Sequence, residues 1–209
     1  SGVGTIAAGV AKAKSDLITI SGSDGGTGAS PASSIHYAGV PVEIGLAETQ
    51  QTLVINNLRG QVKLQADGQL KSGRDVLIMA MLGAEEYGFA TSALIVLGCV
   101  MMRKCHMNTC PMGVATQNPE LRKRFIGHSK YLINFFRFLA RDIRETMASL
   151  GIRKMDDIIG RADMLMVNDE LRKCHAPGLR FDKILFMPEE STENAIINTT
   201  CLLYTSPSP

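Results

Sequence analysis

Three cysteines lie close together near the middle of the chain. Cys99, Cys105 and Cys110 are separated by five and four residues, so that one folded loop can present three sulfur atoms to one site. Thiolates are the ligands that iron–sulfur clusters use. A three-iron cluster has one iron fewer to anchor, and it therefore suits three thiolates without a fourth. The spacing favours an iron–sulfur site over other uses of these side chains.

Two alternatives for the cysteines remain open. Structural zinc sites usually take four ligands, with paired cysteines two to four residues apart, and this spacing does not match. His106 directly follows Cys105, and adjacent residues rarely point at one metal ion. Zinc, or buried and redox-inert thiols, are therefore less favoured. The surrounding methionines are expected to form an apolar jacket rather than to bind metal: Met101, Met102, Met107 and Met112.

Glycine-rich segments that accompany short apolar runs form a second set of candidates. Each could be a simple tight turn, because glycine adopts positive φ at no steric cost. Together they predict backbone N–H groups that converge on a phosphate at the carboxyl ends of successive strands. A glycine-rich loop over 23–30 belongs to the same pattern. The candidate phosphate ligands are Asp67, Gly68, Gln69, Gly83, Ala84 and Glu85.

The candidates are embedded in alternating strand-like and helix-like patterns. Short strands that alternate with helices predict parallel strands joined by right-handed crossovers. Three strands cannot close an eight-stranded barrel, so the pattern fits either a small open α/β sheet or the C-terminal half of a truncated (β/α)8 TIM barrel. We favour the truncated barrel. The expected strands are 17–20 and 62–66, with a strand-to-turn segment at 83–89, and the expected helices are 5–13, 41–58 and 74–82.

The second half of the chain has a different character. Ser129 is expected to cap a long amphipathic helix that ends near Gly151, followed by a short helix over 155–159. Residues 173–186 are expected to be loop with one possible strand. The predicted organisation is a half-barrel with the cysteine loop over 1–151, a linker toward a missing C-terminal domain over 152–200, and a tail over 201–209. This tail looks like a translated sequencing adapter, so it is expected to be non-native.

Composition excludes several function classes. The 209 residues are 45% hydrophobic, enough for one domain with a core, and the net charge is only +2. Neither a basic stripe nor a polybasic run indicates binding to nucleic acid or to a membrane surface. The apolar runs are too short to cross a bilayer. An odd number of cysteines, three of them in one cluster, indicates a cytosolic or stromal metal or redox site rather than a disulfide framework.

Several segments resemble the large subunit of glutamate synthase, in its flavin-binding synthase domain. The similar segments are Val3-Gly4-Thr5-Ile6-Ala7-Ala8-Gly9-Val10-Ala11-Lys12-Ala13, Ser23-Asp24-Gly25-Gly26-Thr27-Gly28-Ala29-Ser30-Pro31, Gly83-Ala84-Glu85-Glu86-Tyr87-Gly88-Phe89, and the stretch from Leu97 through Gln117 that contains the cysteines. The resemblance covers roughly residues 1–165, and the three-cysteine loop after the flavin segment is its most specific part.

The resemblance implies an FMN-binding (β/α)8 barrel with a [3Fe-4S] cluster held by Cys99, Cys105 and Cys110. In this family, electrons pass through the cluster to FMN, which reduces 2-iminoglutarate, formed from 2-oxoglutarate and ammonia, to L-glutamate. The family's FMN-contacting stretch maps onto about 46–103. It includes the six candidates named above, which would lie around the phosphate and ribityl chain. No residue is assigned a catalytic role.

The resemblance also implies partners that the chain does not contain. These are a glutamine amidotransferase domain, the upstream part of the 2-oxoglutarate site, a C-terminal β-helix domain, and ferredoxin or a small subunit that oxidises NAD(P)H. The chain alone is expected to be inactive, and the expected location is the cytoplasm or the plastid stroma. The rival interpretations are a non-catalytic module stabilised by zinc or a cluster, and another FMN barrel oxidoreductase.

Overall fold

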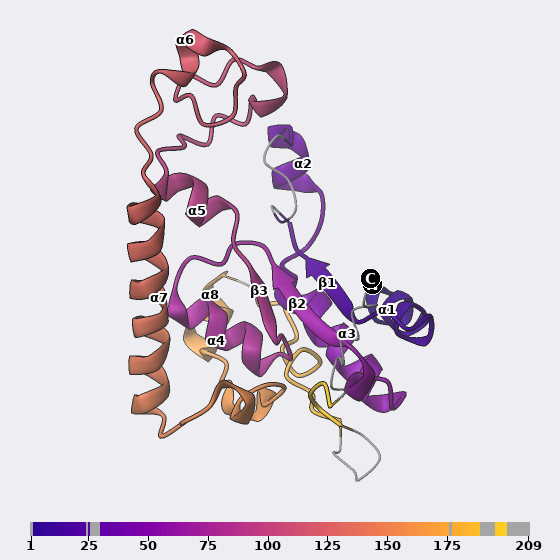
Figure 1. The fold of residues 1–209 in the computed structure, drawn as a ribbon. Coiled ribbons are helices and arrows are strands. Elements are labelled where there is room, and N and C mark those ends of the chain that lie inside the picture. The colour runs from indigo at the N-terminus through magenta and orange to yellow at the C-terminus, as the bar shows by residue number, and fades with distance from the viewer. Residues whose placement is uncertain (1, 24, 26–29, 176, 189–194, 200–209) are drawn as a thin grey trace, which may run out of the picture.

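A computed structural model describes residues 2–23, 25, 30–175, 177–188 and 195–199. Most of the glycine-rich loop predicted over 23–30, and the whole tail predicted over 201–209, therefore lie outside the described residues. Within the described part, helices and short parallel strands alternate, which confirms the α/β class (Figure 1). No helix in this part is long and apolar enough to span a membrane.

The described strands form one parallel sheet in the order β1-β2-β3. Strand β1 (Leu17–Ser21) pairs along its whole length with β2 (Lys63–Asp67), and β2 pairs with the short strand β3 (Glu86–Gly88). Among the described residues, this sheet is open at both edges. A closed barrel is therefore not shown, although a three-stranded parallel sheet with helical crossovers is compatible with part of one.

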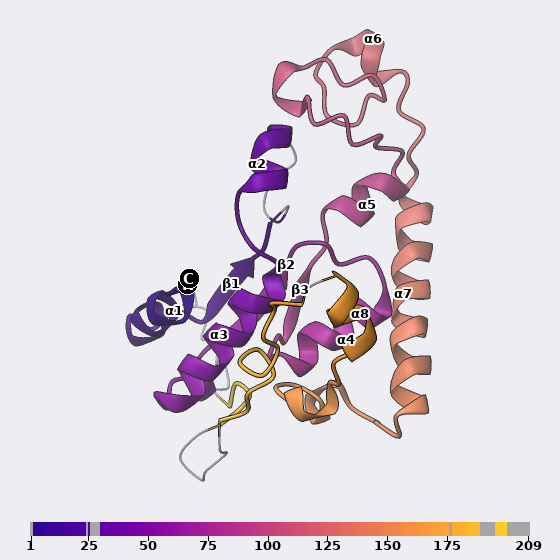
Figure 2. The ribbon, with the colours of Figure 1, turned by 180° about the vertical axis from the view of Figure 1, so that it is seen from behind.

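One face of the sheet is apolar and packs on helices. Burial alternates along β1 and β2, and Ile18, Ile20, Leu64 and Ala66 point to the core. Helices α3 (Val42–Ile55) and α4 (Gly73–Met81) lie over this face, in front of the strands in Figure 2. Helix α1 (Val3–Lys12) packs beside α3. These helices correspond to the three predicted from apolar spacing.

The other face of the sheet is polar. Thr19 donates a hydrogen bond to Oε1 of Gln65 at 3.0 Å, and Ser21 donates one to Oδ2 of Asp67 at 3.3 Å. On the next strand, the ammonium group of Lys63 lies 3.6 Å from the carboxylate of Glu86. Cross-strand side-chain pairs therefore continue along this face, which no described helix covers.

Helix α4 has well-defined signals at both ends. At its start, Ser72 and Asp75 form a capping box. At its end, the N–H of Gly83 donates to the carbonyl of Ala80, and the N–H of Ala84 donates to the carbonyl of Met79. This is a Schellman motif, and its glycine has a φ of +115°, which other residues rarely adopt. Gly83 therefore ends a helix, and the predicted strand-to-turn segment at 83–89 contains a strand only from Glu86.

Helix α7 (Ser129–Ser149) is the predicted long amphipathic helix, and it packs against α4, where Met147 is buried together with Leu77 and Met81. The expected cap at Ser129 is wrong by one residue. Nδ1 of His128 accepts the hydrogen bond from the N–H of Lys130 at 3.3 Å, because an imidazole nitrogen can act as the capping acceptor. In the sequence, the segment between β3 and α7 contains α5 (Thr91–Val96) and α6 (Pro119–Arg122). This segment extends beyond the carboxyl ends of the strands (Figure 1). Helix α2 (Ala32–Tyr37) also extends beyond these ends.

The segment after α7 packs on the sheet domain. Ile158 and Ala162 are buried in the core, and Ile184, Leu185 and Met187 pack against it. The predicted helix over 155–159 is a single 3-10 turn (Met155–Asp157), and a second such turn follows at Ala162–Met164. The described part of 173–186 contains no strand. Helix α8 (Asp169–His175) was not predicted, although its acidic first turn and basic last turn are typical helix signals.

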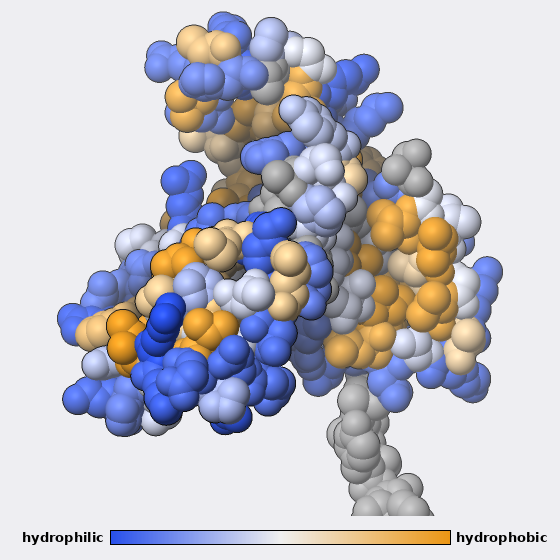
Figure 3. Space-filling model, turned by 90° about the horizontal axis from the view of Figure 1, so that it is seen from above, coloured by the Kyte–Doolittle hydropathy of each residue, from blue (hydrophilic) through white to orange (hydrophobic). Residues whose placement is uncertain are grey.

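Figure 3 shows hydrophobic residues gathered on the right-hand side of the molecule, the side on which α1 lies in Figure 1. Ile6 and Val10 on α1 and Leu17 on β1 are exposed there. Edge strands and apolar patches of this kind normally pair with or pack on further structure.

Candidate functional site

The three predicted metal ligands surround one pocket. Cys99 follows α5, Cys105 begins a 3-10 turn (Cys105–Met107), and Cys110 lies at the far end of the same loop. All three are half-buried, carry no disulfide, and line the same pocket. In the described part of the chain, no three metal-ligating side chains are close enough together to hold a metal ion. The structure thus brings the cysteines to one pocket without closing them around a common centre.

Backbone N–H groups point at two of the sulfur atoms. At Cys110, hydrogen bonding from the N–H of Ala115 is the main reason that the pKa of the thiol is lowered, and the neighbouring N–H groups of residues 112–114 act in the same direction. The N–H of Met101 donates to Sγ of Cys99 at 3.4 Å. Such N–H···S bonds stabilise the thiolate, which is the form that binds metal. They also tune the reduction potential of a bound cluster.

The cysteine loop has an unusual backbone. Met101, Arg103 and Asn108 have φ values of 53°, 56° and 58°, in the left-handed region that side chains rarely allow. The side chain of Asn108 accepts hydrogen bonds from the hydroxyl of Thr116 and the N–H of Gln117, which ties the two ends of the loop together. Strained residues of this kind cluster at binding and active sites, where the surrounding structure maintains them.

The carboxyl ends of the strands form a second candidate site, built from glycines. A Cβ on Gly22 would lie 2.5 Å from the backbone of Val42, and one on Gly25 would lie 2.8 Å from the carbonyl oxygen of Asp67. Gly68 has a φ of +125°, and Gly88 packs against the side chain of Asp67. Only glycine permits the backbones of three neighbouring strand ends to approach this closely.

This edge also offers hydrogen-bond donors. The backbone N–H groups of Gly68, Phe89 and Ala90 form no hydrogen bond within the described residues. They follow the carboxyl ends of β2 and β3, the position at which parallel α/β proteins bind phosphate groups. Among the described residues the edge therefore offers donors for an anion, and of the six predicted phosphate ligands Asp67, Gly68 and Gln69 lie here.

The other three predicted ligands do not share this site. Gly83, Ala84 and Glu85 precede β3, and the N–H of Glu85 donates to the carbonyl of Leu64, at the amino end of β2. From Leu64 to Gly68 an extended chain spans about 13 Å, so the two groups occupy opposite ends of the sheet. The described residues thus show a separation of the two groups that were expected around one phosphate. Its physical reason is that Gly83 belongs to the helix-to-strand turn and not to a strand-to-helix turn.

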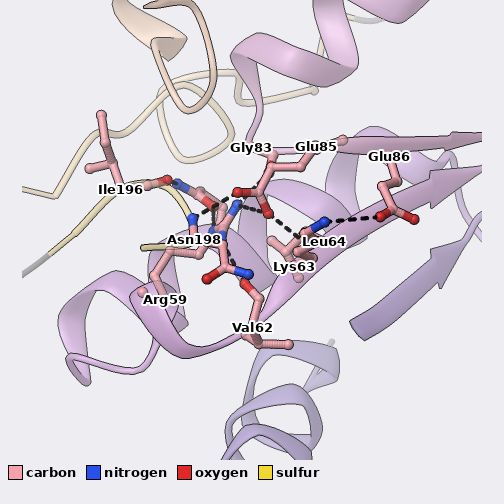
Figure 4. A network of polar contacts seen from close by, with 12 residues as sticks. Arg59, Val62, Lys63, Leu64, Gly83, Glu85, Glu86, Ile196 and Asn198 are labelled. Carbon is pink, nitrogen blue, oxygen red and sulfur yellow. Dashed lines mark hydrogen bonds and ion pairs between the residues drawn. The ribbon is translucent and has the colours of Figure 1, made fainter. Parts of the chain in front are cut away.

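At the amino end, Glu85 belongs to a buried polar network (Figure 4). The fully buried guanidinium of Arg59 lies 3.0 Å from Oε2 of Glu85 and also donates to Oε1 of Gln50 at 2.6 Å and to the carbonyl of Gly83 at 3.0 Å. Burial lowers the pKa of Arg59, and the charge of Glu85 opposes this change. Oε1 of Glu85 accepts a hydrogen bond from the N–H of Asn198 at 2.7 Å. The network therefore connects the sheet to the last part of the described chain.

Sequence reasoning missed Phe89 and Ala90, because it began the third strand too early. A glycine just after a predicted helix, as Gly83 is here, is a typical signal of a helix end. This signal would have started the predicted strand later and placed its carboxyl end after Gly88. The role of Arg59 had no local signal, because its partners Gly83 and Glu85 are distant in the sequence.

Comparison with known proteins identifies the family. The family model described as a conserved region in glutamate synthase matches residues 1–153. The glutamate synthase [NADPH] large chain of Bacillus subtilis is 56% identical over 189 residues, which cover 90% of this chain and 12% of the relative. The glutamate synthase [NADH] of Schizosaccharomyces pombe is 58% identical over 170 residues, 81% of this chain and 8% of the relative.

The ferredoxin-dependent glutamate synthase 2 of Synechocystis is 51% identical over 197 residues, which cover 94% of this chain and 13% of that protein. The chain thus spans about a tenth of the length of the curated relatives that it matches. The cysteine loop and both glycine-rich strand ends lie inside the segment that the family model matches. The chain therefore belongs to the glutamate synthase family and corresponds to a conserved region of the large subunit.

Proposed function

We propose that this chain forms the C-terminal half of an FMN-binding (β/α)8 barrel in a glutamate synthase, with a [3Fe-4S] cluster held by Cys99, Cys105 and Cys110. The observation that carries the proposal is the convergence of three cysteines on one pocket in a loop whose backbone N–H groups point at sulfur. Three thiolates with N–H···S bonds suit an iron–sulfur cluster better than zinc, which takes a fourth ligand.

The FMN phosphate would lie at the carboxyl ends of β2 and β3. The donors would be the N–H groups of Gly68, Phe89 and Ala90, with Asp67 and Gln69 beside them. The glycines at this edge allow the backbones of the strand ends to pack closely against one another. Gly83, Ala84 and Glu85 would act from the other end of the sheet, where they hold β3 in register beside β2.

When bound, FMN supplies hydride transfer and the cluster supplies one-electron transfer. The residues of this chain bind and orient both groups. Phe89 packs edge-to-face on Phe136 of α7, with the ring centroids 5.4 Å apart, so the strand end that would hold FMN and the helix after the cysteine loop support each other. The substrate would be 2-iminoglutarate, formed from 2-oxoglutarate and glutamine-derived ammonia, and the product L-glutamate.

The electron donor would be ferredoxin or a subunit that oxidises NAD(P)H. Relatives at similar identity are named for NADPH, NADH and ferredoxin, so this segment does not discriminate between them. We further propose that the segment over 152–200 is a linker toward a further domain, and its described residues Ile158, Ala162 and Ile184 pack on the core of the sheet domain. Chloroplastic relatives fit a stromal location in plants, with the cytoplasm as the alternative in other organisms.

The test uses the full-length synthase that carries this sequence, purified without oxygen. We expect about three irons and one FMN per chain. Cys105→Ser should lose the cluster, because it removes one of three ligands. Cys174→Ser is the matched control, because Cys174 is exposed on α8 and should not affect iron content. Equal iron loss in the two variants, or zinc in place of iron, would reject the cluster assignment.

A further inference from the structure

One arginine is among the residues that line the cysteine pocket. Arg103 lines the pocket together with Cys99, Cys105 and Cys110. Its side chain is half-buried, and its Nη1 atom is shielded from solvent. Its backbone φ of 56° is costly for a residue with a side chain, so the loop maintains this position against local strain.

The charge of Arg103 is permanent, because a guanidinium group does not lose its proton in proteins. A three-iron cluster with three thiolate ligands carries two negative charges when oxidised, and uptake of one electron from the donor makes three. A fixed cation nearby attracts the more negative form more strongly. We infer that Arg103 is a tuning residue that raises the reduction potential of the cluster, an inference that rests on the proposed function.

The location of the charge determines the size of its effect. Arg103 lies two residues before Cys105 and both line the pocket, so their Cα atoms are at most about 7.6 Å apart. With an effective dielectric constant of about 20, a unit charge within about 10 Å changes an equilibrium by more than tenfold. Lys104 also lines the pocket but is exposed, and Arg122 on α6 is exposed outside it, so water and salt screen both charges.

The experiment is a redox titration of the full-length synthase with dithionite, followed by the electron paramagnetic resonance signal of the oxidised three-iron cluster. Arg103→Gln should shift the reduction equilibrium at least tenfold toward the oxidised form, which is a midpoint potential lower by 59 mV or more for one electron. Arg103→Lys keeps the charge and should stay within threefold of the unmodified enzyme. Arg122→Gln removes an exposed charge and should also stay within threefold.

Three outcomes would overturn the inference while the proposed function stands. The first is an unchanged potential in Arg103→Gln with full iron content. The second is an equal shift in Arg103→Gln and Arg122→Gln, since this would show a general charge effect. The third is loss of the cluster from both Arg103 variants in a folded protein, since this would make the residue necessary for assembly. An unmodified enzyme without iron or without the resonance signal would instead reject the proposed function.

Discussion

Gly83→Val tests whether the two ends of the sheet have separate roles. A Cβ at this position would lie 2.5 Å from Oε1 of Gln50, which is the acceptor for Arg59. The backbone φ of +115° adds strain for any residue with a side chain, about 1–3 kcal/mol. Displacement of a buried hydrogen-bond partner costs about 1–3 kcal/mol more. We therefore expect a local destabilisation of about 2–6 kcal/mol with little change in flavin affinity.

Gly68→Val is the matched control at the other end. Gly68 has a similar φ of +125°, so valine is strained at both positions, but among the described residues the nearest atom to a Cβ here would be the backbone nitrogen of Gly22, at an ordinary contact distance of 3.4 Å. Valine would place methyl groups where the proposed phosphate approaches the N–H of Gly68. The loss of one charge-assisted hydrogen bond costs about 1.5–3 kcal/mol, which is more than tenfold in affinity.

The assay combines two measurements on the full-length synthase. Titration of FMN into the flavin-free protein gives the affinity, and amide hydrogen exchange over residues 73–88 gives the local stability. Gly83→Val should lower exchange protection more than tenfold and leave the affinity within threefold. Gly68→Val should weaken FMN binding more than tenfold. If Gly83→Val weakens FMN binding as much as Gly68→Val while protection is unchanged, the placement of the phosphate at the carboxyl edge is refuted.

The remaining predictions concern stability, and each is measured by hydrogen exchange or thermal unfolding of the full-length synthase. Glu85→Gln leaves the buried charge of Arg59 without its carboxylate and should lower the free energy of unfolding by about 3–5 kcal/mol. Asp182→Asn, in the exposed pair with Arg180, is the control and should have no measurable effect. Equal effects of the two substitutions would contradict the buried network. Ser72→Ala removes the cap of α4 and should cost about 1 kcal/mol; an unchanged α4 would contradict the capping box. Leu53→Ala leaves a cavity in the core and should cost about 2–5 kcal/mol, and a smaller loss would mean that the core collapses around it.

Local patterns in the sequence were sufficient for much of the fold. Apolar spacing predicted α1, α3, α4 and α7 and two of the three described strands. Helices and strands each repeat apolar residues at a fixed short spacing, so the signal lies within the segment itself. The spacing of the cysteines predicted that they would share one site, and they line one pocket. A short loop of this length restricts where its own side chains can lie.

The glycines show the limit of that reasoning. A glycine has the same preference for positive φ after a strand and after a helix, so Gly68 and Gly83 look alike in the sequence. Only the boundary of β3 placed them at opposite ends of the sheet. For the same reason, the free N–H groups of Phe89 and Ala90 became apparent only when the strand end was known.

The sequence by itself thus determined many of the elements, the family and the grouping of three cysteines around one pocket, since each depends on short-range periodicity, spacing or similarity. The tertiary structure decided which residues share an environment. Arg59 meets Glu85 across 26 positions, and Glu85 meets Asn198 across 113, and neither contact has a local signal. Such partners are selected when buried charges must be paired, and that requirement exists only in the folded chain.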